Sequence, residues 1–171
     1  MPVGLTFDAK PGTAAFRSIY AAAFAPPPWH ETPDQIEAFA DRLASHARTP
    51  GFRCDAAYVD GEPAGFVYGF PSPDPWPDDR LYRPIADAVG DLSMLASRFE
   101  LHEVAVDPRF AGRGVGAALV RRLTAGVGAS WLVTAPKAAA AVRLYERLGW
   151  RRLREFTVRG ETFRLYLSPD S

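Results

Sequence analysis

The chain has 171 residues, of which 47% are hydrophobic, and this length and composition suit one domain with a sizeable buried core. Its formal net charge is zero and its sequence pI is about 6.8, so no charge excess favours binding to nucleic acid or to an anionic membrane. Cys54 is the only cysteine, which excludes an intramolecular disulfide and a thiolate metal cluster. The N-terminus lacks the features of a secretory signal, and no run approaches the roughly 18 apolar residues that span a bilayer. We therefore expect a cytoplasmic protein with no nucleic-acid or membrane partner.

The first fifty residues predict one short strand followed by two helices. Val3 to Phe7 has the length and apolar content of a strand. Apolar side chains recur along one side of Thr13 to Phe24, which predicts a helix. Thr32-Pro33-Asp34-Gln35 has the form of a capping box with proline at the first helical position, so a second helix is predicted to begin there. Thr49-Pro50-Gly51 ends it.

The next segment predicts a hairpin and then an irregular stretch. Phe52 to Val59 and Ala64 to Phe70 are apolar runs of strand length, and Asp60-Gly61 between them is a hairpin signal. Residues 71–84 contain too many prolines for regular structure, whereas Ile85 to Ala96 allows one or two short helices. A loop of this length in a small domain is usually disordered or functional.

A strand, a glycine-rich turn and a helix follow one another between Phe99 and Leu123. Phe99 to Val106 is an apolar-rich run of strand length, residues 111–117 hold the glycines, and Val115, Leu119 and Leu123 recur on one helix face. The first turn of a helix leaves N–H groups unpaired and carries partial positive charge, while glycine lets a ligand approach the backbone. This layout predicts a site for phosphate or pyrophosphate.

The spacing of the glycines distinguishes between the known phosphate-binding turns. A P-loop ends in Gly-Lys-Ser/Thr, but Ala117 follows the last glycine, and the dinucleotide pattern G-x-G-x-x-G does not fit glycines spaced two apart. The turn resembles the acetyl-CoA turn of the Gcn5-related N-acetyltransferases, the GNAT superfamily, which reads V-x-P-x-x-(Q/R)-G-x-G-(I/V)-G-x-x-L. The matching residues are Val106, Pro108, Gly112, Gly114, Val115, Gly116 and Leu119. Ala111 replaces the family's Gln or Arg but keeps its backbone N–H; an ordinary strand-to-helix turn is the alternative.

The C-terminal part predicts a strand, a helix and a final hairpin. The strand is Ser130 to Thr134 and the alanine-rich helix is Pro136 to Leu148. Trp150 to Val158 and Glu161 to Leu167 form the hairpin, which turns at Arg159-Gly160. With these elements the predicted order is similar to the whole GNAT fold.

A second motif supports the resemblance. The family's stretch after the fifth strand reads roughly N-x-x-A-x-x-L-Y-x-x-x-G-(F/W), and Ala138 stands in place of its Asn. The residues that match are Ala141, Leu144, Tyr145, Gly149 and Trp150. The resemblance implies one α/β domain over residues 1–171, with a central twisted mixed sheet of about seven strands flanked by helices. Residues 11–98 would then form the acceptor side and residues 99–150 the acetyl-CoA-binding core.

The resemblance implies an N-acetyltransferase that moves an acetyl group from acetyl-CoA to a primary amine of a small molecule, without a metal. Direct transfer in a ternary complex is expected, because Cys54 has no Cys-His context. Backbone at Val104 to Val106 would pair with the pantetheine arm and polarise the thioester carbonyl. The residues expected to bind acetyl-CoA are Val104, Ala105, Val106, Arg109, Ala111, Gly112, Arg113, Gly114, Val115, Gly116, Ala117, Ala138, Ala141 and Tyr145.

Acetyl transfer to an amine needs a base and an acid. A lysine-like amine has a pKa of about 10.4, so its deprotonation at pH 7 costs over about 4 kcal/mol. Strand alternation places Glu100 and His102 on one face and Glu103 on the other, unless a bulge intervenes, and all three are candidate bases. A structural histidine and a solvated or salt-bridged glutamate are the alternatives. In the family a tyrosine at the position of Tyr145 protonates the CoA thiolate, whose conjugate acid has a pKa near 8.5.

The acceptor amine is left open by the resemblance. Aromatic and acidic residues of the N-terminal helices and of the 71–98 segment are candidates for holding a cationic amine, with ordinary surface packing as the alternative. They are Trp29, His30, Trp76 and Tyr82, together with Glu31, Asp78 and Asp79. Because Ala111 and Ala138 depart from the motifs, a regulatory or inactive CoA-binding module is an alternative function, and a peptide or protein acceptor is another. The family often forms dimers, and the sequence does not decide whether this chain is a homodimer.

Overall fold

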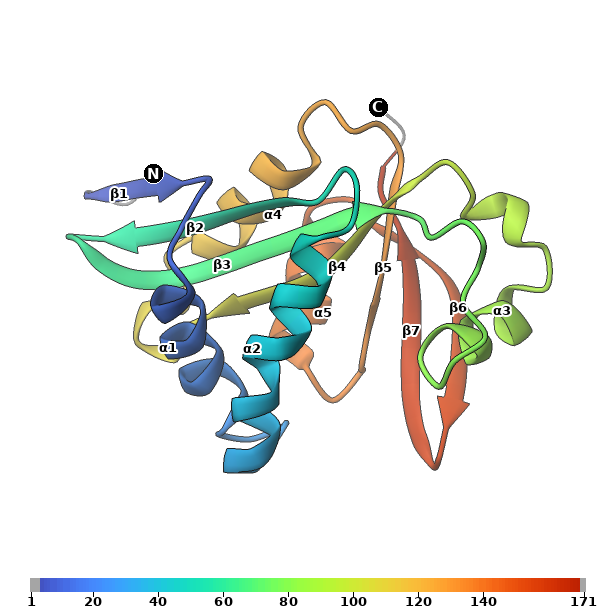
Figure 1. The fold of residues 1–171 in the computed structure, drawn as a ribbon, viewed down its shortest axis with the longest axis horizontal. Coiled ribbons are helices and arrows are strands. Elements are labelled where there is room, and N and C mark those ends of the chain that lie inside the picture. Colours follow the sequence, from blue (N-terminus) through green and yellow to red (C-terminus); the bar gives the residue numbers. More distant parts are fainter. Residues whose placement is uncertain (1–3, 170–171) are drawn as a thin grey trace. The chain divides into compact units, whose positions relative to one another are not determined.

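Seven strands form one mixed sheet in the order β1-β2-β3-β4-β5-β7-β6 in the computed structural model, which describes residues 4–169 (Figure 1). The strands are β1 (Leu5–Asp8), β2 (Arg53–Val59), β3 (Glu62–Pro71), β4 (Phe99–Val106), β5 (Ser130–Thr134), β6 (Arg151–Val158) and β7 (Glu161–Leu167). β4 and β5 are parallel, whereas β1–β2, β2–β3, β5–β7 and β6–β7 are antiparallel. The expected mixed sheet of seven strands is therefore confirmed.

Within residues 4–169, five α-helices and two short 3-10 turns connect the strands. The helices are α1 (Thr13–Phe24), α2 (Pro33–Ala47), α3 (Tyr82–Val89), α4 (Val115–Thr124) and α5 (Ala139–Arg147), and the 3-10 turns are η1 (Leu92–Met94) and η2 (Pro108–Phe110). None of these helices is long and apolar enough to cross a lipid bilayer. The chain divides into two compact units, one of residues up to 70 and 101–125, the other of residues 71–100 and from 126 onward. β4 contributes its first two residues to the second unit and the remainder to the first.

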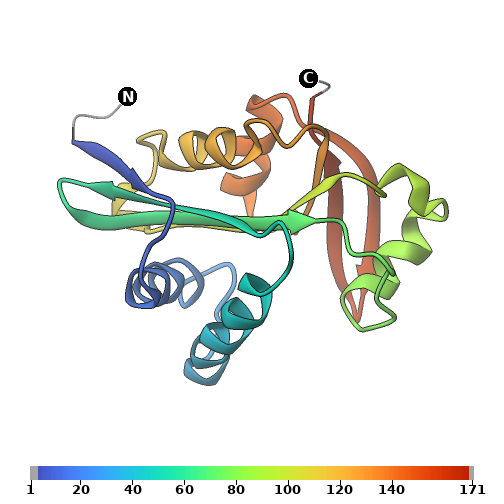
Figure 2. The same ribbon diagram turned by 45° about the horizontal axis from the view of Figure 1, so that its top comes forward.

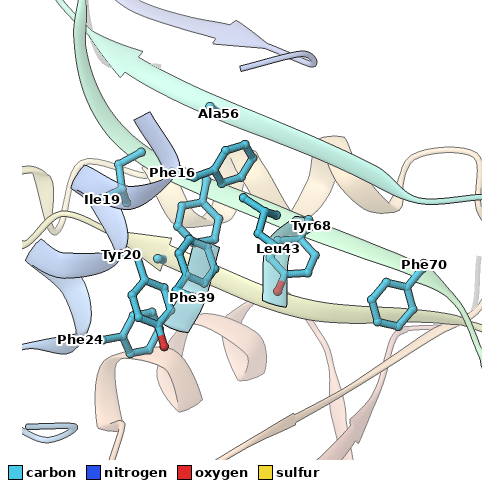
Figure 3. Packing of buried hydrophobic residues seen from close by; sticks show 11 residues of the cluster. Phe16, Ile19, Tyr20, Phe24, Phe39, Leu43, Ala56, Tyr68 and Phe70 are labelled. Carbon is cyan, nitrogen blue, oxygen red and sulfur yellow. The ribbon is translucent and has the colours of Figure 1, made fainter. Parts of the chain in front are cut away.

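In the first unit, α1 and α2 cover one face of β1 to β3 and α4 covers the other (Figure 2). A largely aromatic cluster joins the two helices to the sheet, and in Figure 3 Tyr20, Phe24 and Phe39 lie close together, whereas Phe70 lies apart from them. The rings of Tyr20 and Phe39 stack at 4.0 Å, and Phe16 contacts Phe66 of β3 at 4.8 Å between ring centroids. The predicted capping box at the start of α2 is confirmed, since the Thr32 hydroxyl accepts from the N–H of Gln35.

Gly65 of β3 packs closely against β4 and α4. A Cβ at this position would lie 2.9 Å from the carbonyl oxygen of Ala105 and 3.0 Å from a methyl carbon of Leu119. Gly65→Ala is therefore expected to destabilise the fold by about 1–3 kcal/mol through overpacking, measured by urea unfolding. Gly12→Ala is the matched control, because a Cβ there meets nothing within 4 Å. Equal unfolding midpoints of the two variants would contradict the packing described for Gly65.

In the second unit, β5, β7 and β6 carry a helix on each face. Trp131 of β5 and Leu165 of β7 are fully buried against a cluster that includes Tyr82 and Ile85 of α3. The next residue of β7, Tyr166, points to the opposite face, as strand alternation requires, and lies 6.3 Å from the ring of Tyr145 on α5.

Most predicted boundaries agree with the structure within one or two residues. The strand predicted at Val3 to Phe7 appears as β1 at Leu5–Asp8, and Val3 lies outside the described residues. The hairpin turns at Asp60-Gly61 and Arg159-Gly160 are confirmed, with positive φ at all four residues. The predicted strand over Phe99 to Val106 matches β4 at both ends.

Two helix boundaries were predicted wrongly because of proline. Residues 71–84 were expected to be irregular, yet α3 begins at Tyr82 and contains Pro84 in its first turn. Proline is tolerated there because the N–H groups of the first turn have no intrahelical partner. α5 begins at Ala139 rather than at Pro136, after a turn in which the N–H of Ala138 donates to the carbonyl of Ala135.

Candidate active site

The glycine turn leads from β4 into an uncapped helix N-terminus. Gly112 and Gly114 have φ of +74° and +79°, a left-handed conformation that favours glycine. Gly114 is the N-cap residue of α4 and no side chain caps the helix, so the N–H groups of its first turn, at Val115 to Ala117, have no intrahelical acceptor. A Cβ at either glycine would meet nothing within 4 Å, so the backbone conformation and not crowding selects glycine here. The turn can donate several hydrogen bonds to a phosphate.

The two arginines beside the turn differ in their partners. Arg109 donates to the buried carboxylate of Asp107 at 2.9 Å and lies 3.3 Å from Glu62. Burial acts to raise the pKa of Asp107, but the hydrogen bonds from Arg109 outweigh it and lower that pKa. Arg113 is exposed and lies over the Phe110 ring, with its guanidinium 5.6 Å from the ring centroid. Arg113 is therefore the better placed of the two to meet a ligand phosphate.

His102 of β4 lies among aromatic rings of α2 and β3. Its ring centroid is 4.4 Å from that of His46 and 5.1 Å from that of Phe70. His46 in turn shares a hydrogen bond of 3.0 Å with the Tyr68 hydroxyl. Burial lowers the pKa of His46 to about 4, with His102 and Arg42 adding to the effect, so His46 is neutral at physiological pH.

Glu103 has a protonation equilibrium suited to a general base. Burial raises its pKa to about 7; His102 and Arg42 oppose this rise and Glu31 adds to it. Arg42 lies on α2, as does His46, the neighbour of His102. His102 contacts His46 of α2, and Glu103 interacts electrostatically with Arg42 of α2 and with Glu31, so both residues have neighbours in the helical segments of the first unit. The placement of the two side chains on opposite faces stays a prediction.

A phenol connects the charged groups around Glu103. The Tyr20 hydroxyl donates to Oε1 of Glu31 at 2.9 Å and accepts from Nη2 of Arg42 at 2.8 Å. Burial raises the pKa of Tyr20, and the nearby carboxylate of Glu103 raises it further. No sequence pattern singles out Tyr20 or Arg42, since Tyr20 follows the apolar pattern of its helix and Arg42 is one of many arginines.

Glu100, Tyr82 and Trp76 lie together in the second unit. The carboxylate of Glu100 is buried and accepts a hydrogen bond of 2.7 Å from the Tyr82 hydroxyl. The Trp76 indole N–H donates to the carbonyl of Tyr82, and its ring packs 5.8 Å from Trp131. Asp79 accepts from the N–H of Tyr82 at the start of α3. Each of these candidates thus has a contact that supports the core of this unit.

The remaining candidates have varied surroundings. Tyr145 lies in α5 with 3% of its surface exposed and packs 6.0 Å from Trp150. Ala138 is the N-cap residue of α5 and offers no capping side chain. Trp29 is half-buried against Phe24, and His30 is exposed with φ of +49°.

Known proteins resemble both the sequence and the fold. The model of the acetyltransferase (GNAT) family matches residues 14–150. A GCN5-like protein acetyltransferase of Mycobacterium tuberculosis is 33% identical over 125 residues, which cover 67% of this chain and 61% of the relative.

Two solved structures share the fold at low sequence identity. The ribosomal-protein-S18-alanine N-acetyltransferase of Escherichia coli is 20% identical with a TM-score of 0.65, covering 98% of this chain and 94% of its own. A phosphinothricin acetyltransferase of Sinorhizobium meliloti, solved with AcCoA, is 17% identical with a TM-score of 0.65. The alignment covers 99% of this chain and 90% of that structure. The family model matches most of the chain, and the glycine-rich turn leads from β4 into α4. This protein therefore belongs to the acetyltransferase (GNAT) family.

Proposed function

We propose that this protein is an acetyl-CoA-dependent N-acetyltransferase that acts on a primary amine of a small molecule by direct transfer. One observation carries the proposal: the strand that leads into the uncapped, glycine-rich helix N-terminus also holds a carboxyl group with a pKa of about 7. A phosphate-binding turn and a base with a pKa near neutrality, both on one short segment, suit group transfer from a phosphorylated donor.

The chain offers acetyl-CoA two kinds of contact. Backbone N–H groups from Gly112 to Ala117 would hold the pyrophosphate, and Arg113 would add charge. Among the described residues, β4 pairs with β5 at Phe99 and Glu100. The end of β4, from Val104 to Val106, lies beyond this pairing and would bind the pantetheine arm, as in the family.

The chemistry would use an ionisable group on β4 and Tyr145. Glu103, with His102 as the alternative, takes a proton from the acceptor ammonium, and the neutral amine forms a C–N bond to the thioester carbonyl carbon. The C–S bond breaks, and the thiolate takes a proton from Tyr145. Cys54 is not the nucleophile, because burial raises the pKa of its thiol to about 11 and keeps it protonated.

Replacing the glycines of the turn tests the donor site. Gly112→Ala with Gly114→Ala is expected to weaken acetyl-CoA binding about tenfold or more, because alanine resists the left-handed backbone that orients the N–H groups. Isothermal titration calorimetry measures the effect. Gly160→Ala is the matched control: its φ is +79° and its surroundings are open, but it lies in the β6–β7 turn. Equal affinities in all three proteins would contradict the assignment of the turn.

Thiol release from acetyl-CoA, measured against a panel of amines, tests the whole proposal. The wild type is compared with Glu100→Gln, His102→Ala, Glu103→Gln and Tyr145→Phe. Turnover that falls about 100-fold in at least one variant supports the enzyme, within the range of general acid–base groups. Binding of acetyl-CoA without turnover of any amine or peptide would favour the CoA-binding module instead.

A protein or peptide acceptor is the second candidate. The 33% identical relative is named a protein acetyltransferase, which favours a lysine side chain or a peptide N-terminus. Including peptides in the same panel separates the two candidates.

A further inference from the structure

Two charged side chains hydrogen-bond to the hydroxyl of Tyr20, and a third ionisable side chain interacts with it electrostatically. Glu31 comes from the α1–α2 connection, Arg42 from α2 and Glu103 from β4. Tyr20 bonds directly to the first two and interacts electrostatically with the third. All of them belong to the first compact unit. This set, Tyr20, Glu31, Arg42 and Glu103, is called the Tyr20 cluster below.

The polar groups of the Tyr20 cluster are incompletely paired within the described residues, and Arg42 is exposed to solvent. Oε2 of Glu31 is buried and has no hydrogen-bond partner within residues 4–169. Arg42 uses one N–H on a neutral phenol, and its guanidinium lies 5.6 Å from the ring centroid of Tyr20 and 5.7 Å from that of Phe39. No ion pair joins Arg42 to a carboxylate in the described part of the chain. Leaving a buried carboxylate oxygen unmatched is costly, so the cluster is suited to a ligand that brings its own charges.

The balance of charge indicates what such a ligand carries. Glu31 supplies a negative charge, Arg42 a positive one, and Glu103 a carboxyl that changes protonation near neutral pH. The net charge of these three side chains lies between zero and minus one. A neutral zwitterion matches it, because such a ligand brings one positive and one negative charge of its own. A polyamine would be better held by an excess of carboxylates, and a guanidinium beside its ammonium groups would repel it. A sugar hydroxyl would need neither charge.

We infer that the acceptor is a small zwitterion that carries its primary amine close to a carboxylate, such as an amino acid. The guanidinium of Arg42 pairs with the acceptor carboxylate, for which its planar fork is suited. Glu31 holds the ammonium, and Glu103 removes its first proton. This inference rests on the proposed acetyltransferase function and names its substrate class.

The reaction on such an acceptor balances without a further reactant. The ammonium gives one proton to the Glu103 carboxylate, and the nitrogen lone pair forms the amide bond to the acetyl carbon. The C–S bond breaks with its electron pair on sulfur, and the thiolate takes one proton. The nitrogen loses its second proton as the amide forms, so one proton is released to solvent for each turnover.

A comparison of matched acids and amides tests the inference. The rate of thiol release is measured for a set of amino acids, for the corresponding amino acid amides and for spermidine, with wild type and Arg42→Gln. In the wild type, kcat/KM is expected to be about 100-fold higher for the best acid than for its amide, since the amide loses the pair with Arg42. In Arg42→Gln this ratio is expected to fall to near one. The ratio cancels any effect of Arg42 on Glu103, because both substrates use the same base.

A matched control variant and two different negative results complete the experiment. Arg48→Gln removes an exposed arginine at the C-terminal end of the same helix and is expected to keep the ratio of the wild type. Faster turnover of amides or spermidine than of any acid, or an unchanged ratio in Arg42→Gln, overturns the inference while the acetyltransferase function stands. If acetyl-CoA binds and no amine of any kind is acetylated, the proposed function itself fails, and the inference falls with it.

Discussion

Glu103→Gln is expected to lower kcat/KM for amine acetylation by about 100-fold or more and to remove the rise in rate across about pH 6 to 8. In the proposed mechanism the carboxylate form of Glu103 is the base, and its pKa of about 7 places the loss of activity on the acid side of neutrality. The groups that set this pKa besides burial are His102 and Arg42, which lower it, and Glu31, which raises it. A pH profile of kcat/KM measures the effect.

The same profile separates Glu103 from His102. If the rise with pH persists in Glu103→Gln and disappears in His102→Ala, then His102 is the base and the assignment of Glu103 is wrong. Glu37→Gln is the control, because Glu37 is exposed on α2 and pairs with Arg17. Its profile is expected to match that of the wild type.

Glu103 is also expected to cost stability at alkaline pH. Burial raises its pKa from the ordinary value of 4.5, which the unfolded chain keeps, to about 7 in the folded protein, so below pH 4.5 both states hold the proton. As the pH rises through this window, the unfolded chain releases its proton first, and the free energy of unfolding falls. Glu103→Gln is therefore expected to be more stable than the wild type at pH 8, by up to about 3 kcal/mol, and equal to it at pH 4. Urea unfolding at both pH values measures the difference.

Tyr145→Phe is expected to lower kcat about 100-fold while leaving the affinity for acetyl-CoA unchanged. Tyr145 is buried and its ring packs on Trp150 and Tyr166, contacts that phenylalanine preserves. The variant therefore loses the hydroxyl and its proton but not the packing of α5. Single-turnover kinetics with thiol detection measures the chemical step, and calorimetry measures binding.

The control for this prediction is a tyrosine of the first unit. Tyr58→Phe changes a partly buried tyrosine of β2, and its kcat is expected to equal that of the wild type. An unchanged kcat in Tyr145→Phe would remove Tyr145 from the mechanism. A reduced affinity for acetyl-CoA with an unchanged kcat would make it a binding residue instead.

The stability cost of Glu103 and its proposed role have the same origin. Burial disfavours the charged carboxylate, which raises the pKa toward neutrality and makes the group a better base. A glutamine at this position would relieve the cost and lose the base. Gains in stability at the expense of function are common at active sites.

Local signals in the sequence were sufficient for most of the secondary structure. The capping box at Thr32 and the turns at Asp60-Gly61 and Arg159-Gly160 were predicted from a few adjacent residues and are confirmed. Such features depend on contacts within four residues, so the sequence contains all of their determinants. The errors at Pro84 and Pro136 arose because proline can either open a helix or precede one, and the distinction depends on the residues packed against it.

The candidate site was predictable where it is a linear motif. The glycine turn with Gly112 and Gly114 depends on backbone conformation, and glycine reports that conformation directly in the sequence. The environment of Glu100 was not predictable in this way. Its partner Tyr82 belongs to a proline-rich segment whose path no local pattern specified, and the hydrogen bond between them exists only in the folded chain.

The family, the order of strands and helices and the glycine-rich turn follow from residues close together in the sequence, because hydrogen bonds and capping of the backbone are local. The Tyr20 cluster follows from the packing of α1 and α2 on β4, which brings together residues far apart in the chain. Burial at that place moves the pKa of Glu103 toward neutrality, and no sequence pattern carries that information, since desolvation depends on every neighbour at once.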